Sequence, residues 1–180
     1  MCVLSNRDIV GRVKDGSLVI EPFEPETNLG PDSYDLHLGG EYISFESVWK
    51  LESVDLAAQA GRNFLTGEIG LCVNHVDNLP VLVLRPGQVV IAHLHEYVKI
   101  PDDLVGYIDG KSKWARLGLQ IASAGLVHVS WEGYPVLELV NLGNLPLKLT
   151  EGLAICQIFF YTLTSPALPT DELLILWKGE

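Results

Sequence analysis

Three of the twelve basic residues of this 180-residue chain fall within six consecutive positions. Lys111, Lys113 and Arg116 surround the hydroxyl of Ser112, directly after an Asp-Gly turn signal. A turn exposes backbone N–H groups, and lysine and arginine neutralise anionic oxygens, so this composition suits a phosphate chain. The alternative is a solvated loop with ordinary surface cations. The residues of this segment alone leave both possibilities, a phosphate site and a solvated loop, open.

Glu138 is the second candidate for chemistry. The alternation around it predicts a strand with Val136, Glu138 and Val140 on one face. A carboxylate between two valines is costly to desolvate unless it is paired or used, for instance as a general base. The alternative is an ion-paired or edge-exposed glutamate.

The histidines carry weaker signals. His128 stands alone in a turn-rich segment, where a histidine is more often structural than catalytic. His93 and His95 share one strand face, but no third ligand follows at a metal-binding spacing, so we predict no metal site. The zinc-deaminase signature H-x-E with P-C-x-x-C is absent, as are the P-loop, the G-x-S-x-G elbow and the dinucleotide fingerprint. Any deamination by this chain would therefore have to proceed without zinc.

Short strands must position most of these residues. A helix is expected after Ser5, with Asp8 as capping-box partner and Gly16 at its end. Turn signals such as Gly39–Gly40, Pro86–Gly87 and Pro101–Asp102 separate the strands that follow. The predicted strands cover residues 17–20, 42–45, 81–84, 89–93, 104–108, 136–140 and 154–161. This spacing is typical of a sandwich or barrel, in one domain over residues 1–180.

Two segments are less clear. Residues 47–67 are helical or irregular, and the apolar string 173–177 predicts either a donated strand or a terminal helix.

The composition excludes several classes of protein. Apolar residues make up 48% of the chain and charged residues 19%, which favours a compact globular fold over disorder. The net charge of −11 repels nucleic acid and anionic membranes, so we expect neither as a partner. No membrane-length apolar run and no signal peptide is found, so a cytoplasmic location is expected. The cysteines, Cys2, Cys72 and Cys156, form no disulfide pattern.

Several segments, in order, resemble the deoxycytidine triphosphate deaminases of the dCTP deaminase/dUTPase superfamily. The residues that carry this resemblance are Leu-Ser-Asn-Arg-Asp-Ile at 4–9, Gly-Pro-Asp-Ser-Tyr-Asp-Leu-His-Leu-Gly at 30–39, 97–106 before the loop, Gly-Lys-Ser at 110–112 with Arg-Leu-Gly-Leu at 116–119, Trp-Glu-Gly at 131–133 with Glu138 and Asn141, and 152–157. They span roughly residues 3–165.

The resemblance implies a mainly β fold, a distorted, jelly-roll-like barrel with a short N-terminal helix, assembled as a homotrimer with active sites between subunits. It implies that Glu138 takes a proton from the water that attacks C4 of cytosine, and that Ser112 and Arg116 position that site. By the same resemblance the substrate-binding residues are Lys111, Lys113, Ala124, His128 and Gln157. Magnesium would arrive on the nucleotide triphosphate, with no protein ligand and no zinc.

The chain departs from the family pattern at several positions. His128 stands where the triphosphatases and most deaminases have an aspartate, which in the triphosphatases activates the attacking water. Leu126 replaces an arginine of many bacterial deaminases. Lys111 and Lys113 replace arginine and serine, and no counterpart of the C-terminal lid is expected.

These features leave three hypotheses. The first is zinc-independent deamination of dCTP to dUTP and ammonia. The second is dUTP pyrophosphatase activity, alone or combined with deamination. The third is a nucleotide-binding or regulatory member that has lost catalysis.

Overall fold

The structure, a computed structural model, describes residues 2–45, 73–78, 81–122 and 124–168. The two segments that the sequence left unclear, 47–67 and 173–177, lie outside these residues. Among the described residues no helix is long and apolar enough to cross a membrane.

The N-terminal helix α1 (Asn6–Lys14) begins as the sequence predicts. The Ser5 hydroxyl accepts the backbone N–H of Asp8, and the Asp8 carboxylate accepts the backbone N–H of Ser5, which is a capping box. Ile9 on its apolar face is fully buried. Gly16, with a φ of 79°, follows the helix end.

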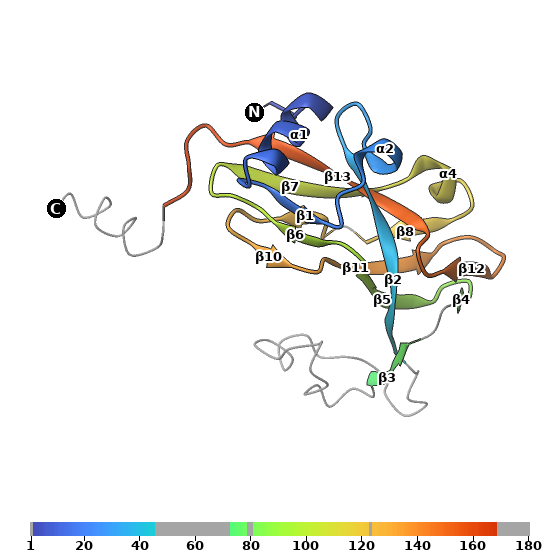
Figure 1. Cartoon of the computed structure of the whole chain (residues 1–180). Helices are drawn as coiled ribbons and strands as arrows, with labels where there is room; N and C mark the ends of the chain where they lie inside the picture. The colour runs from blue at the N-terminus through green and yellow to red at the C-terminus, as the bar shows by residue number, and fades with distance from the viewer. Residues whose placement is uncertain (1, 46–72, 79–80, 123, 169–180) are drawn as a thin grey trace.

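Strands make up most of the remaining described chain (Figure 1). They are β1 (Val19–Glu21), β2 (Tyr34–Phe45), β3 (Val73–Asn78), β4 (Val81–Leu84), β5 (Val89–Leu94), β6 (Tyr97–Lys99), β7 (Leu104–Gly110), β8 (Leu119–Ile121), β9 (Leu126–Val127), β10 (Glu132–Gly133), β11 (Val136–Asn141), β12 (Leu147–Thr150) and β13 (Ala154–Thr162). Two short helices are α2 (Pro25–Asn28) and α4 (Ser112–Ala115). The prediction of a mainly β fold with a short N-terminal helix is confirmed.

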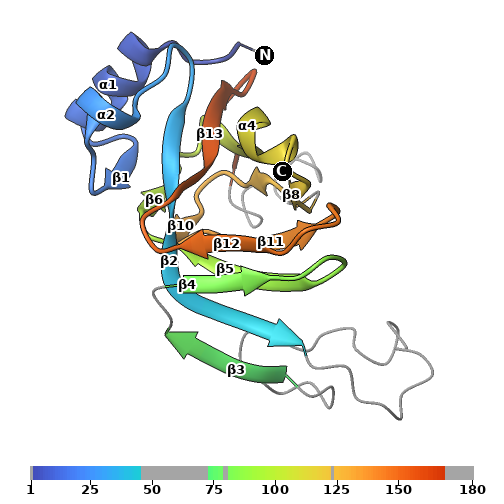
Figure 2. The ribbon, with the colours of Figure 1, turned by 90° about the vertical axis from the view of Figure 1, so that its right-hand side faces the viewer.

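The largest sheet has the order β8-β11-β5-β2-β13-β7-β9, and β3 pairs with β2 outside this path. A three-stranded sheet, β1-β6-β10, and the pair β12-β4 complete the described topology. Every strand pairing described is antiparallel. The large sheet is curled into half a barrel around the core (Figure 2). The homotrimer and the extent of the domain over residues 1–180 remain predictions.

Strand β2 gives the large sheet its curl (Figure 2). Its first part pairs with β13 and its second part with β5 and β3, with a register shift between Leu38 and Tyr42. Gly39 and Gly40 lie at this shift, so the prediction of a turn there is wrong. A Cβ on Gly39 would lie 3.0 Å from the carbonyl oxygen of His93. Glycine inside a strand allows such a close backbone approach, and here it bends the strand instead of ending it.

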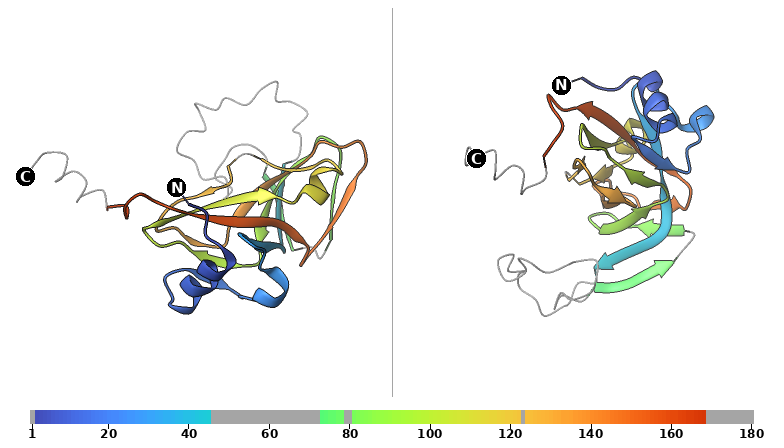
Figure 3. Two further views of the ribbon diagram at one scale, coloured as in Figure 1. Left: turned by 90° about the horizontal axis from the view of Figure 1, so that it is seen from above. Right: turned by 60° about the vertical axis from the view of Figure 1, so that its left-hand side comes forward.

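The core fills the inside of the curl. Its largest fully buried side chains are Tyr34, Tyr42, Phe160, Ile9, Leu18, Ile20, Leu36, Leu38, Leu84, Ile100, Leu104 and Leu139. Helices α1 and α2 lie next to each other on one side of the sheets (Figure 3).

Candidate functional site

The basic segment forms one exposed helical turn between β7 and β8. Lys111 is the N-cap residue of α4, and its carbonyl accepts the N–H groups of Trp114 at 2.9 Å and Ala115 at 3.1 Å. Ser112 and Arg116 lie at the two ends of the turn and are exposed, as is Lys113 between them. The turn therefore offers one hydroxyl and two cationic side chains to solvent.

Trp114 anchors this turn to the body of the protein. Its indole N–H donates to the carbonyl of Ala154 at 2.8 Å, at the start of β13. The ring packs against the core and borders an apolar hollow of 270 Å³ shared with residues of β12. The ammonium of Lys113 lies 4.5 Å from the centre of the Trp114 ring, a cation–π contact.

Two glycines, Gly118 and Gly143, allow the end of the turn to pack closely against the residues that follow β11. Gly118 has a φ of 95°, and a Cβ there would lie 2.4 Å from the backbone nitrogen of Gly143. The carbonyl of Gly118 accepts the N–H of Leu142 at 2.8 Å. The buried Asn141 side chain accepts the N–H of Gly143 at 2.9 Å and donates to two carbonyls. Asn141 is thus a structural residue that holds this junction.

Lys111 does not share the exposure of its neighbours. Its ammonium forms an ion pair with the carboxylate of Asp35 on β2, and the two side chains are only 16% and 25% exposed. Nothing in the local sequence signals this contact, because it joins the start of α4 to β2, which is distant in the chain.

Glu138 occupies the strand position that the alternation predicts. Along β11 Leu137, Leu139 and Asn141 are buried, whereas Val136, Glu138 and Val140 are half-buried on the opposite face. Glu138 pairs in register with Ile91 of β5, so an apolar residue lies directly across from it. Among the described residues no hydrogen bond or ion pair of its carboxylate is found. The carboxylate therefore lies on an apolar surface without a neutralising partner in the described part of the chain.

Ala124 lies close to Glu138 in the fold. The carbonyl of Glu138 accepts the N–H of Ala122 at 2.8 Å, and the carbonyl of Ala122 accepts the N–H of Ala124 at 2.8 Å. Gly125 then packs against β7, where a Cβ would lie 2.2 Å from the carbonyl oxygen of Ile108. The segment is held by backbone contacts, and Ala124 itself is exposed.

Within one chain the exposed turn and Glu138 lie at different ends of the β8–β11 pair. Leu119, just after the turn, pairs with Asn141, three residues beyond Glu138. At about 3.3 Å per residue this places them roughly 10 Å apart along the strand. A single chain thus brings Ala124 to Glu138, while Ser112 and Arg116 remain at the far end.

Gln157 lies near the start of the exposed turn, whereas His128 lies elsewhere on the surface. Gln157 of β13 pairs in register with Asp35 and with Asp109, so it lies beside the Asp35–Lys111 pair. The Ser33 hydroxyl donates to its side-chain oxygen at 3.5 Å. His128 is exposed after β9, and no side-chain contact links it to Glu138 among the described residues.

Cys156 of β13 is buried and pairs in register with Leu36 and Gly110, the neighbours of Asp35 and Lys111 in the chain. Burial raises the pKa of its thiol well above the ordinary value, and the charges of Glu96 and Asp35 raise it further. The thiol is therefore protonated and unreactive at neutral pH.

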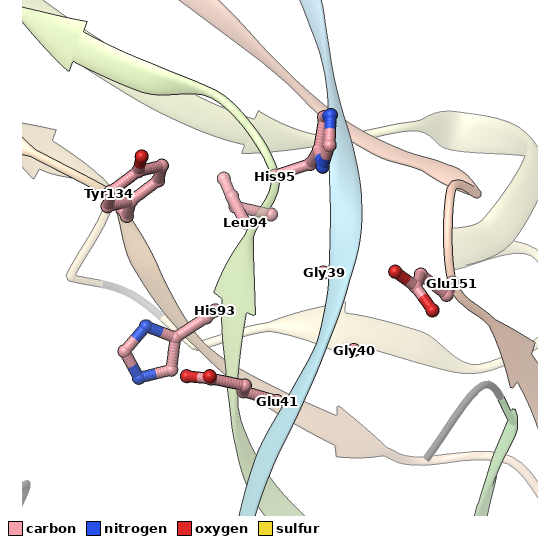
Figure 4. A pocket seen from close by; sticks show the side chains of 8 residues that line it. All are labelled: Gly39, Gly40, Glu41, His93, Leu94, His95, Tyr134 and Glu151. Carbon is pink, nitrogen blue, oxygen red and sulfur yellow. The ribbon is translucent and has the colours of Figure 1, made fainter. Parts of the chain in front are cut away.

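His93 and His95 line a separate hollow of 330 Å³ (Figure 4). Glu41, Tyr134 and Glu151 also line it. Within the described ranges no group of three or more His, Cys, Asp or Glu side chains is arranged to hold a metal ion.

Comparison with known proteins identifies the relationship. A family model described as dCTP deaminase-like matches residues 3–163. A "dCTP deaminase, dUMP-forming" of Methanopyrus kandleri is 39% identical over 172 residues, covering 93% of this chain and 85% of the relative. A "dCTP deaminase" of Haloarcula marismortui is 35% identical over 167 residues, covering 92% and 83%.

One solved structure supports the fold. The 2'-deoxycytidine 5'-triphosphate deaminase from Agrobacterium tumefaciens superposes with a TM-score of 0.67 at 20% identity, over 99% of this chain. This chain spans about half of that protein, 53% of its length.

Proposed function

The chain belongs to the dCTP deaminase family, whose members are hydrolases, and we propose that it removes the amino group of dCTP by hydrolysis without zinc. The observation that carries the proposal is the half-buried Glu138, which lies on an apolar face with no side-chain partner among the described residues. A carboxylate in that state is available to accept a proton from water.

The reaction is proposed as follows. Glu138 takes a proton from a water molecule while the water oxygen bonds to C4 of cytosine. The accepted proton passes to the amino group, which leaves as ammonia, and the second water proton ends on N3 of the ring. The products are dUTP and ammonia. The exposed residue Ala124 would contact the base through its backbone, and His128 would lie near the sugar.

The exposed turn is proposed to bind and position the nucleotide. Lys113 and Arg116 are exposed cations in a protein of net charge −11, so they form a local exception to a surface that repels anions. Lys111 and Gln157 border the same region. Magnesium would be carried by the triphosphate, where it neutralises phosphate charge.

A homotrimer would complete the site. Ser112 and Arg116 lie at the far end of β8 from the Glu138 of their own chain, so we propose that they act on the Glu138 of a neighbouring copy. The face around Glu138 suits an interface, because Val89 is 40% exposed and Val136 and Val140 are half-exposed there. Sedimentation of the purified protein as a monomer under assay conditions would contradict this arrangement.

The test is a panel of pyrimidine deoxynucleotides with magnesium, read for both ammonia and pyrophosphate. We expect ammonia release from dCTP, reduced at least about 100-fold in Glu138→Gln with nucleotide binding retained. The matched control is Glu132→Gln, which alters an exposed glutamate and should leave the rate unchanged. Full activity of Glu138→Gln would refute the assignment of the base, and tight binding of dCTP without turnover would refute deamination.

A second candidate function is the further conversion of dUTP to dUMP and pyrophosphate. The relative from Methanopyrus kandleri is a dUMP-forming enzyme, which favours this addition. His128 stands where the triphosphatases have their aspartate, which argues against it. Pyrophosphate released in step with ammonia would establish dUMP as the product, and ammonia alone would establish dUTP.

A further inference from the structure

The Asp35–Lys111 ion pair joins the exposed turn to the centre of the large sheet. Asp35 lies on β2, in register with Gln157 of the neighbouring β13. The Lys111 side chain is only 16% exposed and that of Asp35 25%. A lysine in an open phosphate loop would normally extend into water, so its burial here indicates that it is held.

The backbone of Lys111 determines where the turn begins. Its carbonyl accepts the N–H groups of both Trp114 and Ala115, which closes the turn. The carbonyl of Ser112 accepts the N–H of Arg116 at 3.1 Å, so the next bond depends on the first. Fixing the Lys111 side chain therefore restricts the directions in which Ser112 and Arg116 point.

Asp35 and a bound phosphate would compete for the same ammonium. If Lys111 moved to a phosphate, Asp35 would keep a partly buried negative charge beside a polyanionic ligand, which is unfavourable. Lys113 and Arg116 have no such carboxylate partner among the described residues. The favourable arrangement leaves Lys111 with Asp35 and gives the anionic tail to the two exposed cations.

We propose that Asp35 is a positioning residue of the nucleotide site: it holds Lys111 at the start of α4, and through Lys111 it orients Ser112 and Arg116. The inference rests on the proposed function for its catalytic consequence. The structural part, a turn locked by an ion pair, does not depend on which nucleotide binds.

The first measurement is amide hydrogen exchange of residues 113–117 without nucleotide. We expect Asp35→Asn and Lys111→Gln to speed exchange of the Trp114, Ala115 and Arg116 amides at least about tenfold, because each variant removes one partner of the ion pair. The double variant should be no faster than the faster single variant. Asp32→Asn, an exposed aspartate nearby, is the control and should leave exchange unchanged.

The second measurement is kcat and KM for dCTP. Positioning predicts that Asp35→Asn and Lys111→Gln both lower kcat about tenfold, and that Lys111→Arg restores most of it because the ion pair is kept. Lys113→Gln should raise KM without the tenfold loss of kcat, since it removes a ligand of the phosphates and keeps the Asp35–Lys111 ion pair.

A different pattern of KM and amide exchange in these variants would overturn the inference. If Lys111 binds phosphate directly, Asp35→Asn frees the ammonium and lowers KM, whereas Lys111→Gln raises KM with unchanged exchange. Should Asp35→Asn unfold, the Lys111 variants carry the test, because Lys111 lies in the turn itself. If the wild-type protein does not turn over dCTP, the proposed function fails, while the exchange experiment still decides whether Asp35 locks the turn.

Discussion

Two glutamates near β5 differ in what surrounds their carboxylates. Glu96, directly after β5, is 1% exposed, and both of its oxygens are used by His37: one accepts the backbone N–H at 2.8 Å and the other lies 2.5 Å from Nδ1 of the ring. Glu138, on the partner strand β11, is half-buried with an apolar residue opposite and no side-chain partner among the described residues. Glu96 is a structural residue whose two carboxylate oxygens are already hydrogen-bonded by His37, whereas Glu138 keeps a carboxylate that a substrate or a water can contact.

The largest effect is expected at the partner of Glu96. His37→Ala should lower the free energy of unfolding by about 3 kcal/mol, because it leaves a buried carboxylate with only the backbone N–H of residue 37. Urea unfolding measures the loss. His95→Ala is the matched control, since it removes an exposed imidazole next to Glu96. Equal stability of the two variants would show that Glu96 needs no partner, and the contrast between Glu96 and Glu138 would then be wrong.

A second contrast compares two glycines, Gly118, which contacts the residues just after β11, and Gly87, which has open space around it. Gly118→Ala and Gly87→Ala both place a side chain at positive φ, which costs about 1 kcal/mol. Gly118→Ala should cost a further 1–3 kcal/mol or so, because its Cβ would meet the backbone of Gly143, whereas nothing lies near Gly87. Chemical denaturation of both variants gives the difference, and a smaller loss for Gly118→Ala than for Gly87→Ala would contradict the close contact.

Cys156 is a buried thiol whose pKa is raised chiefly by its own burial and next by the charge of Glu96. Burial, and then the Glu96 charge, raise the pKa of this thiol, so the folded protein keeps it protonated while the unfolded chain ionises it above about pH 8.5. The unfolded state then binds fewer protons, so this stabilising contribution is complete at lower pH and is lost as the pH rises. Above pH 9 the free energy of unfolding should fall by up to about 1.4 kcal/mol per pH unit more than in Cys156→Ala. Parallel pH curves of the two proteins would rule out this coupling.

The smallest effect on stability is expected at Glu138 itself. Glu138→Gln should change the free energy of unfolding by less than about 0.5 kcal/mol, because the carboxylate has no described partner to lose. A loss comparable to that of His37→Ala would place Glu138 among the structural glutamates and remove the basis of the proposed mechanism. Thermal unfolding and the ammonia assay on the same preparation separate the two roles.

Local patterns predicted the parts of this molecule that depend on neighbouring residues. The capping box at Ser5 and the exposure alternation around Glu138 were read correctly, because both follow from the geometry of one helix or one strand. The turn at Pro86–Gly87 followed from the same kind of signal. The order of the motifs was enough to indicate the family, which the family match over residues 3–163 confirms.

Contacts between distant segments could not be read in this way. Gly39–Gly40 has the composition of a turn, but the neighbouring strand β5 pairs across it and makes it a bend inside β2. The hydrogen bonds between His37 and Glu96, 59 residues apart, have no periodic signal in the sequence.

The sequence by itself determined which residues could perform chemistry and, for Glu138, on which face of its strand the side chain would lie. Only the tertiary structure decided which of the polar side chains are paired. Asp35 forms an ion pair with Lys111, and His37 is hydrogen-bonded to Glu96. The side chains of Lys113, Arg116 and Glu138 have no such partner among the described residues. The physical reason is that an ion pair depends on distance in space, and the pairing of strands far apart in the chain sets that distance.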